Sequence, residues 1–373
     1  MRKFVYILLI HVGLCSWAFG SESQEKWQIF RGDANLTGVS HVELPEQLRL
    51  LWTFKTDDEI RSSAVIDDNK AYIGSSDGAV YALNISDGEK IWAYKTDDSV
   101  VEAPPLLADG SVFVGSLDGI LYALDAENGS LKWKFETDGK IVGSANYSLI
   151  EGMPRIFFGS YDSKIYCLDA QSGKSVWTYE SKNFINGSPA TDGERLIFGG
   201  CDAHLHLIST KEGVSSAIID VGSYVAGSAA LVGTNAYLGT YGGKAIAVDL
   251  ATKKIIWEYG DEENGAAFIS SPAVTEDQVV IGSRDQFLYC LDRKNGRMIW
   301  KFHTRDEVDG SPTICRDKVL IGSGDGRLYM ISLIDGSEIW SYEVGAEIVG
   351  APAVIKNTVV IGSGDGLVYC FGR

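Results

Sequence analysis

Apolar and polar residues alternate over short runs along almost the whole chain, and turns rich in glycine and aspartate separate the runs. Residues 70–73 form one such run and residues 80–83 form the next, with Asp77-Gly78 between them. Alternation with a period of two is typical of β-strands, and Asp-Gly between two strands favours a tight hairpin because glycine readily adopts positive φ. A second turn at 84–89 leads into an aromatic run at 91–96. The pattern therefore predicts units of short antiparallel strands.

This unit occurs eight times, and a glycine-led core marks the central hairpin of each copy. The cores start 40 to 44 residues apart, at Gly74, Gly115, Gly159, Gly199, Gly239, Gly282, Gly322 and Gly362. A ladder of tryptophans has the same period and consists of Trp52, Trp92, Trp133, Trp177, Trp257, Trp300 and Trp340, with Ala217 in the slot of the fourth unit. A repeat of about 40 residues that contains four strands is typical of one β-propeller blade. The predicted fold is all-β, an eight-bladed β-propeller of four-stranded blades over residues 50–373.

Both ends of the repeat indicate how the ring closes. The first outer strand, at residues 50–56, has no inner strands before it, and the last unit stops at Arg373 before an outer strand of its own. Pairing the two would complete the eighth blade and remove a free sheet edge. Small residues such as Gly310-Ser311-Pro312 mark the innermost strand of each unit. We expect bulkier side chains to clash there, because the strands crowd together near the axis.

The first 20 residues have the pattern of a secretory signal peptide. A basic start at Arg2-Lys3 precedes an apolar core and the small-x-small sequence Ala18-Phe19-Gly20, as cleavage by a signal peptidase requires. We therefore expect a periplasmic or secreted protein. Attachment as a lipoprotein through Cys15 is the less favoured alternative, because Leu14 is larger than the residue that lipid attachment prefers before the cysteine.

Residues 21–49 form a lead-in to the repeat. Trp27 and Phe30 are expected to pack on the edge of the propeller, and Arg31 is expected to hold a loop. The chain carries 50 acidic against 33 basic residues, for a net charge of −17. That charge argues against nucleic acid as a partner, since phosphate binding needs basic surfaces. No other stretch is apolar enough to span a membrane, and we expect a monomer.

The repeat carries a longer signature, Ala/Cys-x-Asp-x-x-x-Gly-x-x-x-Trp. It occurs at Ala123, Asp125, Gly129 and Trp133 and returns as Cys290, Asp292, Gly296 and Trp300. It resembles the tryptophan-docking motif of the pyrroloquinoline-quinone-like (PQQ-like) propellers, in which each tryptophan lies between neighbouring blades. The resemblance covers nearly all of residues 27–373. It implies the fold, and the docking role of the tryptophan ladder, but not one function.

The family has two branches. Quinoprotein dehydrogenases hold PQQ and Ca²⁺ on the propeller axis and oxidise alcohols or sugars, often with a disulfide between adjacent cysteines. The other branch is a non-catalytic scaffold, exemplified by the propeller lipoprotein of the outer-membrane β-barrel assembly machine. This chain has no adjacent cysteines, no Asp-rich calcium loop, and only about 40 residues per blade. We therefore expect a protein-binding scaffold of the cell envelope without catalysis, cofactor or metal. The alternatives are a PQQ- and Ca²⁺-dependent dehydrogenase or a ligand-sensing propeller.

The cysteines and histidines do not form a recognisable site. Cys167, Cys290 and Cys370 share one repeat position, where other units carry Ala or Met, so a small apolar core slot explains them. An odd number of cysteines after residue 20 disfavours a disulfide framework. His204 and His206 share one face of a strand, but no third metal ligand accompanies them.

Differences between the units provide the remaining functional signal. Most residues that enter the innermost strand are apolar or small, but Arg61, Glu102, Asn186 and Asp309 are not. We expect the four to line the axial mouth of the propeller, either as mutually paired ions that plug the channel or as a small-ligand site. The longest loop on that face, residues 260–268, carries Glu262, Glu263 and Phe268. An exposed phenylalanine among acids would suit a protein or peptide partner.

Overall fold

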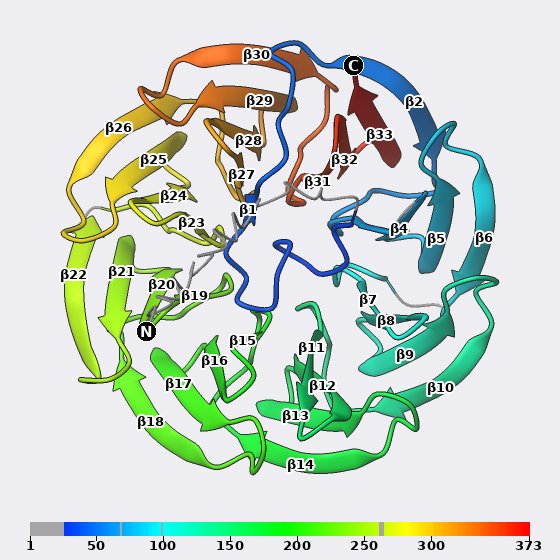
Figure 1. Cartoon of the computed structure of the whole chain (residues 1–373), viewed down its shortest axis with the longest axis vertical. Helices are drawn as coiled ribbons and strands as arrows, with labels where there is room; N and C mark the ends of the chain where they lie inside the picture. The colour runs from blue at the N-terminus through cyan, green and yellow to red at the C-terminus, as the bar shows by residue number, and fades with distance from the viewer. Residues whose placement is uncertain (1–25, 68, 98–99, 261–264) are drawn as a thin grey trace, which may run out of the picture.

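A computed structural model describes residues 26–67, 69–97, 100–260 and 265–373. Eight sheets of antiparallel strands stand around a central axis, in chain order, as the blades of a β-propeller (Figure 1). This confirms the predicted fold class. Among the described residues no helix is long and apolar enough to cross a membrane.

The first four blades follow one another without a crossover. Blade 1 comprises β3 (Val65–Asp67), β4 (Lys70–Gly74), β5 (Ala79–Asn84) and β6 (Lys90–Lys95). Blade 2 comprises β7 (Leu106–Ala108), β8 (Ser111–Gly115), β9 (Ile120–Asp125) and β10 (Leu131–Glu136). Blade 3 comprises β11 (Asn146–Ile150), β12 (Met153–Gly159), β13 (Lys164–Asp169) and β14 (Ser175–Glu180). Blade 4 comprises β15 (Ala190–Thr191), β16 (Arg195–Gly199), β17 (His204–Ser209) and β18 (Ser215–Asp220).

The remaining blades repeat this order. Blade 5 comprises β19 (Ala230–Val232), β20 (Asn235–Gly239), β21 (Lys244–Asp249) and β22 (Lys254–Gly260). Blade 6 comprises β23 (Ala273–Val274), β24 (Gln278–Gly282), β25 (Phe287–Asp292) and β26 (Met298–His303). Blade 7 comprises β27 (Thr313–Cys315), β28 (Lys318–Gly322), β29 (Arg327–Ser332) and β30 (Glu338–Glu343), and β1 (Val39–Ser40) adds a parallel fifth strand to it. Blade 8 comprises β31 (Ala353–Ile355), β32 (Thr358–Gly362), β33 (Leu367–Gly372) and β2 (Arg49–Lys55).

The two ends of the repeat close the ring as predicted. Strand β2 pairs antiparallel with β33, from Arg49 opposite Gly372 to Lys55 opposite Leu367. Figure 1 shows the blue β2 beside the red β33 on the rim of the disc. The observed strand begins and ends one residue before the predicted range of 50–56, and its pairing leaves β33 without a free edge.

Burial explains the alternating pattern of the sequence. The middle strands of each blade lie between neighbouring sheets, so both of their faces are largely buried, as in β8 and β9. The outer strands alternate between exposed and partly buried residues, as in β10 and β14. Near the axis the innermost strands approach so closely that a Cβ on Gly187 would lie 2.6 Å from the carbonyl oxygen of Gly227 in the next blade. Small residues are therefore required there, as the sequence indicates.

Six tryptophans join neighbouring blades at the outer rim. Each indole Nε1 donates a hydrogen bond to a backbone carbonyl in the next blade and packs on a nearby turn glycine. The donor–acceptor pairs are Trp52–Ile85, Trp92–Ala126, Trp133–Ala170, Trp177–Thr210, Trp257–Arg293 and Trp300–Leu333. Trp340 instead packs edge-on against Phe371. The fourth slot holds Ala217, which has no indole to donate.

The lead-in crosses the axis, and its predicted place on the propeller edge is wrong for Phe30. Lead-in carbonyls accept hydrogen bonds from backbone N–H groups of innermost strands in six blades. These donors are Ile66, Leu107, Thr191, Leu231, Val274 and Ile314. The unpaired N–H groups of the innermost strands face the axis, so a segment laid across them satisfies several blades at once. Trp27 packs on blade 1, whereas Phe30 reaches the axial pocket.

Arg31 holds the lead-in to two blades, which extends its expected structural role. Its guanidinium is fully buried and donates to the carbonyl oxygens of Pro272 at 2.9 Å and Pro312 at 2.5 Å. Burial lowers the pKa of Arg31 to about 9. The same side chain fills the space beside Gly38, where a Cβ would lie 1.9 Å from Nη2.

Candidate functional site

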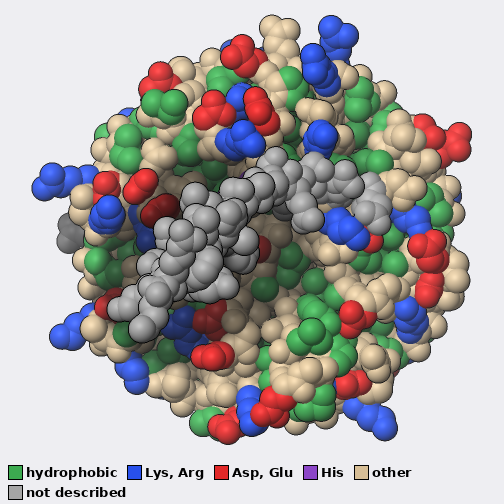
Figure 2. All heavy atoms as spheres, in the orientation of Figure 1, with side chains coloured by type: hydrophobic (Ala, Val, Ile, Leu, Met, Phe, Trp, Pro, Cys, Tyr) green, Lys and Arg blue, Asp and Glu red, His purple; other side chains and the backbone are tan. Residues whose placement is uncertain are grey.

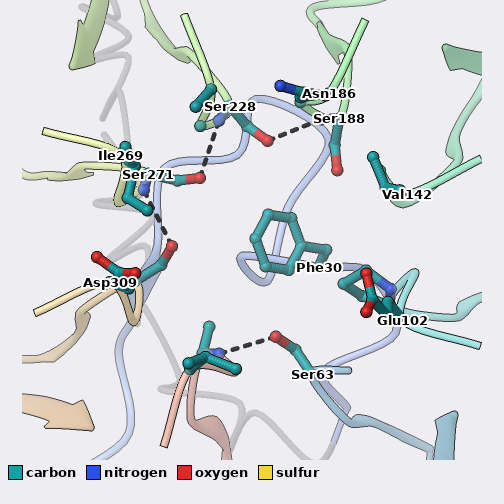
Figure 3. A pocket seen from close by; sticks show the side chains of 18 of the residues that line it. Phe30, Ser63, Glu102, Val142, Asn186, Ser188, Ser228, Ile269, Ser271 and Asp309 are labelled. Carbon is teal, nitrogen blue, oxygen red and sulfur yellow. Dashed lines mark hydrogen bonds between the residues drawn. The ribbon is translucent and has the colours of Figure 1, made fainter. Parts of the chain in front are cut away.

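An axial pocket with a volume of about 300 Å³ lies where the eight innermost strands begin. All four predicted entry residues, Arg61, Glu102, Asn186 and Asp309, line it, and they come from blades 1, 2, 4 and 7. The apolar entry residues of other blades, such as Val142 and Ile269, line it as well. Figure 3 shows Phe30 near the middle of the view, with Glu102, Val142, Asn186, Ile269 and Asp309 arranged around it. The lead-in therefore supplies part of the pocket, which the sequence did not indicate.

A ring of serines forms the wall below the entry residues. The backbone N–H groups of Ser144, Ser188, Ser228 and Ser271 donate to the Oγ of the serine in the next blade, at 2.8 to 3.0 Å. Ser63 accepts likewise from the N–H of Ala351 at 2.8 Å. Pro104 in blade 2 and Ala351 in blade 8 interrupt the ring, since neither side chain carries a hydroxyl. These bonds join one blade to the next along the pocket wall, and Figure 3 draws those of Ser63, Ser188, Ser228 and Ser271.

Two arginines at the mouth are neutralised by a larger number of acids. Arg61 Nη1 lies 2.9 Å from Glu347 Oε1 and 3.7 Å from Glu59 Oε2, and its Nε lies 3.8 Å from Glu102 Oε1. Three carboxylates therefore surround a single guanidinium, and only Glu347 lies within hydrogen-bond distance of it.

Arg284 makes the second charged cluster. Its Nε and Nη2 donate to both oxygens of Asp309 at 3.0 and 2.8 Å, and Glu307 lies 3.4 Å away. The hydrogen bonds with Asp309 raise the pKa of Arg284 further above its already high value. In these two clusters, two arginines therefore face five carboxylates, so the clusters carry a net negative charge.

Asn186 lies between the charged clusters and differs from both. Its Nδ2 donates to the Sγ of Cys201 at 3.3 Å, while its buried Oδ1 has no hydrogen-bond partner among the described residues. Burial raises the pKa of the Cys201 thiol, so the thiol stays protonated at neutral pH.

Aromatic side chains, three of them exposed and one partly buried, lie on one side of the mouth, and we call Tyr161, Phe184, Tyr224 and Tyr241 the aromatic arc. They come from the turns and blade connections of blades 3 to 5. Phe184, Tyr224 and Tyr241 are 49%, 55% and 52% exposed. The Tyr161 and Phe184 rings stack with centroids 5.1 Å apart. Arg284 lies 6.0 Å from the Tyr241 ring, so the arc adjoins the charged mouth.

On the opposite side of the mouth, acids occupy the repeat position that Phe184 and Tyr224 hold, two residues before the entry residue. We call Glu59, Glu307 and Glu347 the acidic arc. The carbonyl of each accepts a hydrogen bond from the neighbouring hairpin turn, as the carbonyls of Phe184 and Tyr224 do, all at 2.8 to 2.9 Å. This shared bond places both arcs on one face of the propeller. Figure 2 shows the disc in the orientation of Figure 1, with acidic and basic side chains interspersed over the face toward the viewer.

The structure contradicts the prediction for the loop at 260–268. Phe268 is only 4% exposed and packs with Tyr289 at a centroid distance of 5.7 Å. It occupies the core slot that Ile141 and Ile185 fill in their own units, so the preceding loop does not present it to solvent. Glu262 and Glu263 lie outside the described residues. Their role in partner binding, like that of the four entry residues, stays a prediction.

Sequence reasoning missed Arg284, Glu347, Phe30 and the aromatic arc. A usable signal was present, because the third residue of each Gly-Ser-x-Asp turn and the residue two places before each entry position vary from unit to unit. Tyr161, Tyr241 and Arg284 occupy the first of these positions, and Glu347 occupies the second.

The histidines and cysteines have structural surroundings. His206 is buried, lies 2.9 Å from Asp202 through Nε2, and contacts the Tyr179 hydroxyl through Nδ1 at 3.0 Å. Its burial lowers its pKa. Cys167, Cys290 and Cys370 are free and buried, as expected for a core slot. Within the described ranges, no three His, Cys, Asp or Glu side chains are grouped so that they could hold a metal ion.

The sequence matches the family described as outer membrane protein assembly factor BamB, whose repeat model aligns with residues 45–152, 151–260 and 215–373. The chain belongs to this family. No curated protein matches the chain in sequence.

Solved structures show the same fold in both functional branches. BamB from Moraxella catarrhalis superposes with a TM-score of 0.74 at 19% identity, over 88% of this chain and 100% of that one. A europium-containing methanol dehydrogenase gives 0.79 at 14% identity, over 93% of this chain and 98% of that one. Quinohemoprotein alcohol dehydrogenase from Comamonas testosteroni gives 0.79 at 16% identity, over 93% and 80%. At these identities the likeness shows the fold alone, so the function has to be argued from the site.

The axial pocket of this PQQ-repeat propeller does not fit the quinone of the dehydrogenase branch. PQQ carries three carboxylates, and binding them needs cationic or hydrogen-bonding groups that are free to engage the ligand. Arg61 and Arg284 are the arginines at the mouth, and both already contact carboxylates. The surplus of acids would repel a trianion, and the described residues offer no cluster that could hold Ca²⁺ beside it.

Proposed function

We propose that this chain is a non-catalytic scaffold of the cell envelope that binds a protein partner through the face around the axial pocket. The aromatic arc is the observation that carries the proposal. Large aromatic side chains that are half exposed and clustered are typical of interface anchors rather than of a free surface. Their backbone is fixed by the hairpin-turn hydrogen bonds of the blades, so they are presented at little entropic cost.

The two arcs together define the chemistry of the partner. An apolar patch fits the aromatic arc, and basic side chains beside that patch would meet the acidic arc across the mouth. The entry residues Glu102 and Asp309 add to the negative side. A partner of this kind would associate faster at low salt, because the opposed charges steer the encounter and salt screens them.

An envelope location follows from the same proposal. The family to which the chain belongs carries the description outer membrane protein assembly factor BamB. The signal-peptide pattern at residues 1–20, which lies outside the described residues, agrees with export.

Capture from envelope extract tests the scaffold. A tagged wild-type protein should retain a partner that the double variant Phe184→Ser/Tyr224→Ser loses. Leu149→Ser/Ile334→Ser is the matched control, since these side chains are 60% and 74% exposed and belong to β11 and to the turn after β29. Equal retention by both double variants would contradict binding through the aromatic arc.

Titration decides between the scaffold and the dehydrogenase. We expect no saturable binding of PQQ in the presence of Ca²⁺, and no dye-linked oxidation of alcohols or aldoses. The physical reason is the excess of carboxylates over arginines at the mouth. A stoichiometric, Ca²⁺-dependent isotherm that Arg61→Ala abolishes would overturn the scaffold and establish the dehydrogenase.

A further inference from the structure

A second pocket, of about 560 Å³, lies at the other ends of the innermost strands. Its lining comes from the lead-in and from blades 5, 6 and 7, and none of its residues lines the axial pocket. Its volume is within the range of about 300–1,000 Å³ that is typical of small-molecule sites.

The walls of this pocket are aliphatic. Val39, Val232, Val274 and Ile314 line it, and the last two are buried in the core. Val39 and Val232 are only partly buried, so a ligand that covers them gains by removing apolar surface from water, while Val274 and Ile314 form the floor behind them.

Arg293 is the cation of this pocket that has no acidic partner among the described residues. Arg293 is partly buried, and its Nη1 donates to the carbonyl of Thr275 at 3.1 Å, while its Cζ lies 6.0 Å from the Tyr237 ring. Among the described residues no carboxylate lies within ion-pair distance of its guanidinium. The same slot holds Ile85, Ala126, Ala170, Thr210, Leu250 and Leu333 in six other units, and Arg373 in the eighth.

The other charged groups of the pocket are largely engaged. Arg316 donates to the carbonyl of His41 at 2.9 Å and lies 3.4 Å from Glu43. Asp33 accepts from the backbone N–H of Thr37 at 3.1 Å. Glu276 is the exposed acid of the rim, and it lies beyond ion-pair distance of Arg293. The free capacity of the pocket is therefore a guanidinium beside aliphatic walls.

We propose that this pocket binds a small amphiphile, with an aliphatic chain against Val39, Val232, Val274 and Ile314 and an anionic head on Arg293. A carboxylate or phosphate can pair with the guanidinium through two parallel N–H···O bonds. The head can belong to a free acyl carboxylate or to an anionic lipid of a bilayer, and both present the same chemistry. This site acts independently of the partner face proposed above, since the two pockets share no residue.

Calorimetric titration of the full chain with sodium dodecanoate, below its micellar concentration, tests the site. We expect one saturable site in wild type and binding at least about tenfold weaker in Arg293→Leu, because a charge-assisted hydrogen bond is lost. Leucine occupies this slot as Leu333 in blade 7, so the variant should keep its fold. Arg297→Leu, an exposed arginine of the same turn, is the matched control and should bind as wild type. Dodecanol lacks the carboxylate, so it should bind wild type only as weakly as dodecanoate binds Arg293→Leu.

Sedimentation with vesicles distinguishes the two sources of the ligand. Binding of phosphatidylglycerol but not phosphatidylcholine vesicles, lost in Arg293→Leu, would assign the site to a bilayer lipid. Binding of dodecanoate alone would assign it to a free acyl carboxylate. Failure of wild type to bind dodecanoate and vesicles, or equal binding by wild type and Arg293→Leu, would overturn the proposal. Loss of partner capture has no bearing on these results, because the aromatic arc is intact in Arg293→Leu.

Discussion

Two junctions between neighbouring blades differ in the side chains that fill them. One joins blades 2 and 3, and the other joins blades 4 and 5. At the first, the Trp133 indole donates to the carbonyl of Ala170 at 3.1 Å and covers Gly173, where a Cβ would lie 2.7 Å from the indole. At the second, Ala217 replaces the tryptophan and Lys253 replaces the turn glycine. Lys253 Nζ donates to the carbonyl of Ser216 at 2.8 Å.

The difference shows why the turn glycine accompanies the tryptophan. Lys253 adopts a φ of 59°, so this turn can be made without glycine, although a side chain is strained there. The other turns also need glycine because the indole occupies the space of a Cβ. Loss of the indole frees that space, and the lysine then supplies a single exposed polar bond in place of an aromatic contact. We therefore expect the junction of blades 4 and 5 to be the weaker of the two.

The largest effect should come from opening the ring at β2. Replacing residues 49–56 with a Gly-Ser linker of equal length removes the outer strand of blade 8 and the Trp52 contact with Ile85. The free β33 edge and the uncovered apolar faces should abolish the cooperative unfolding transition, as measured by circular dichroism. Leu51→Ser, at a residue that is 48% exposed in the same strand, should melt like wild type. An unchanged melting temperature in the linker variant would contradict closure as a source of stability.

Removal of a present indole should have the next largest effect. Trp133→Ala should lower the free energy of unfolding by about 3 kcal/mol, near the lower end for a tryptophan because the ring is partly exposed. Urea denaturation measures the change, and Lys134→Ala on the same strand is the control. A loss below about 1 kcal/mol, the size of a single hydrogen bond, would mean that the aromatic contact adds little.

Restoring the missing indole should have a smaller and opposite effect. Ala217→Trp combined with Lys253→Gly should stabilise the protein by about 1–2 kcal/mol, since it buries aromatic surface at the weaker junction. Ala217→Trp alone should destabilise it, because the Lys253 side chain occupies the space that the indole needs. Hydrogen exchange of wild type should be fastest in blades 4 and 5. Uniform exchange around the ring would remove the basis of the comparison.

A pH effect of about 1 kcal/mol or less should come from His206 in blade 4. Burial lowers the pKa of His206 below its ordinary value of about 6.5, so the unfolded chain binds more protons than the native one below that pH. Stability should therefore fall as the pH falls from 7.5 to 5.5. His206→Tyr would copy the Tyr166–Asp162 pair of blade 3, at 2.6 Å, and should flatten this fall, whereas the exposed His303→Gln should not. Equal slopes in wild type and His206→Tyr would refute the assignment.

Local sequence was sufficient for the fold. Alternation, Asp-Gly turns and the spacing of the glycine cores each depend on neighbouring residues, so the number of blades, the four strands and the closing strand could be predicted without contacts. The placement of Arg61, Glu102, Asn186 and Asp309 around the axis followed from the same repeat, because equivalent positions in a propeller lie on one ring. The prediction that Phe268 is exposed is wrong because its loop is longer than the others, and the extra length obscures its alignment with Ile141 and Ile185.

The sequence by itself determined an eight-bladed ring, its closure and the four entry residues of its mouth. Tertiary structure decided what those residues meet. Arg61 pairs with Glu347 across 286 positions of sequence, and Phe30 enters the pocket because lead-in carbonyls satisfy inner-strand N–H groups in six blades. The aromatic arc likewise forms only when turns from blades 3 to 5 come together. Such contacts depend on closing the ring, which brings distant residues within a few ångströms, and no local pattern encodes those distances.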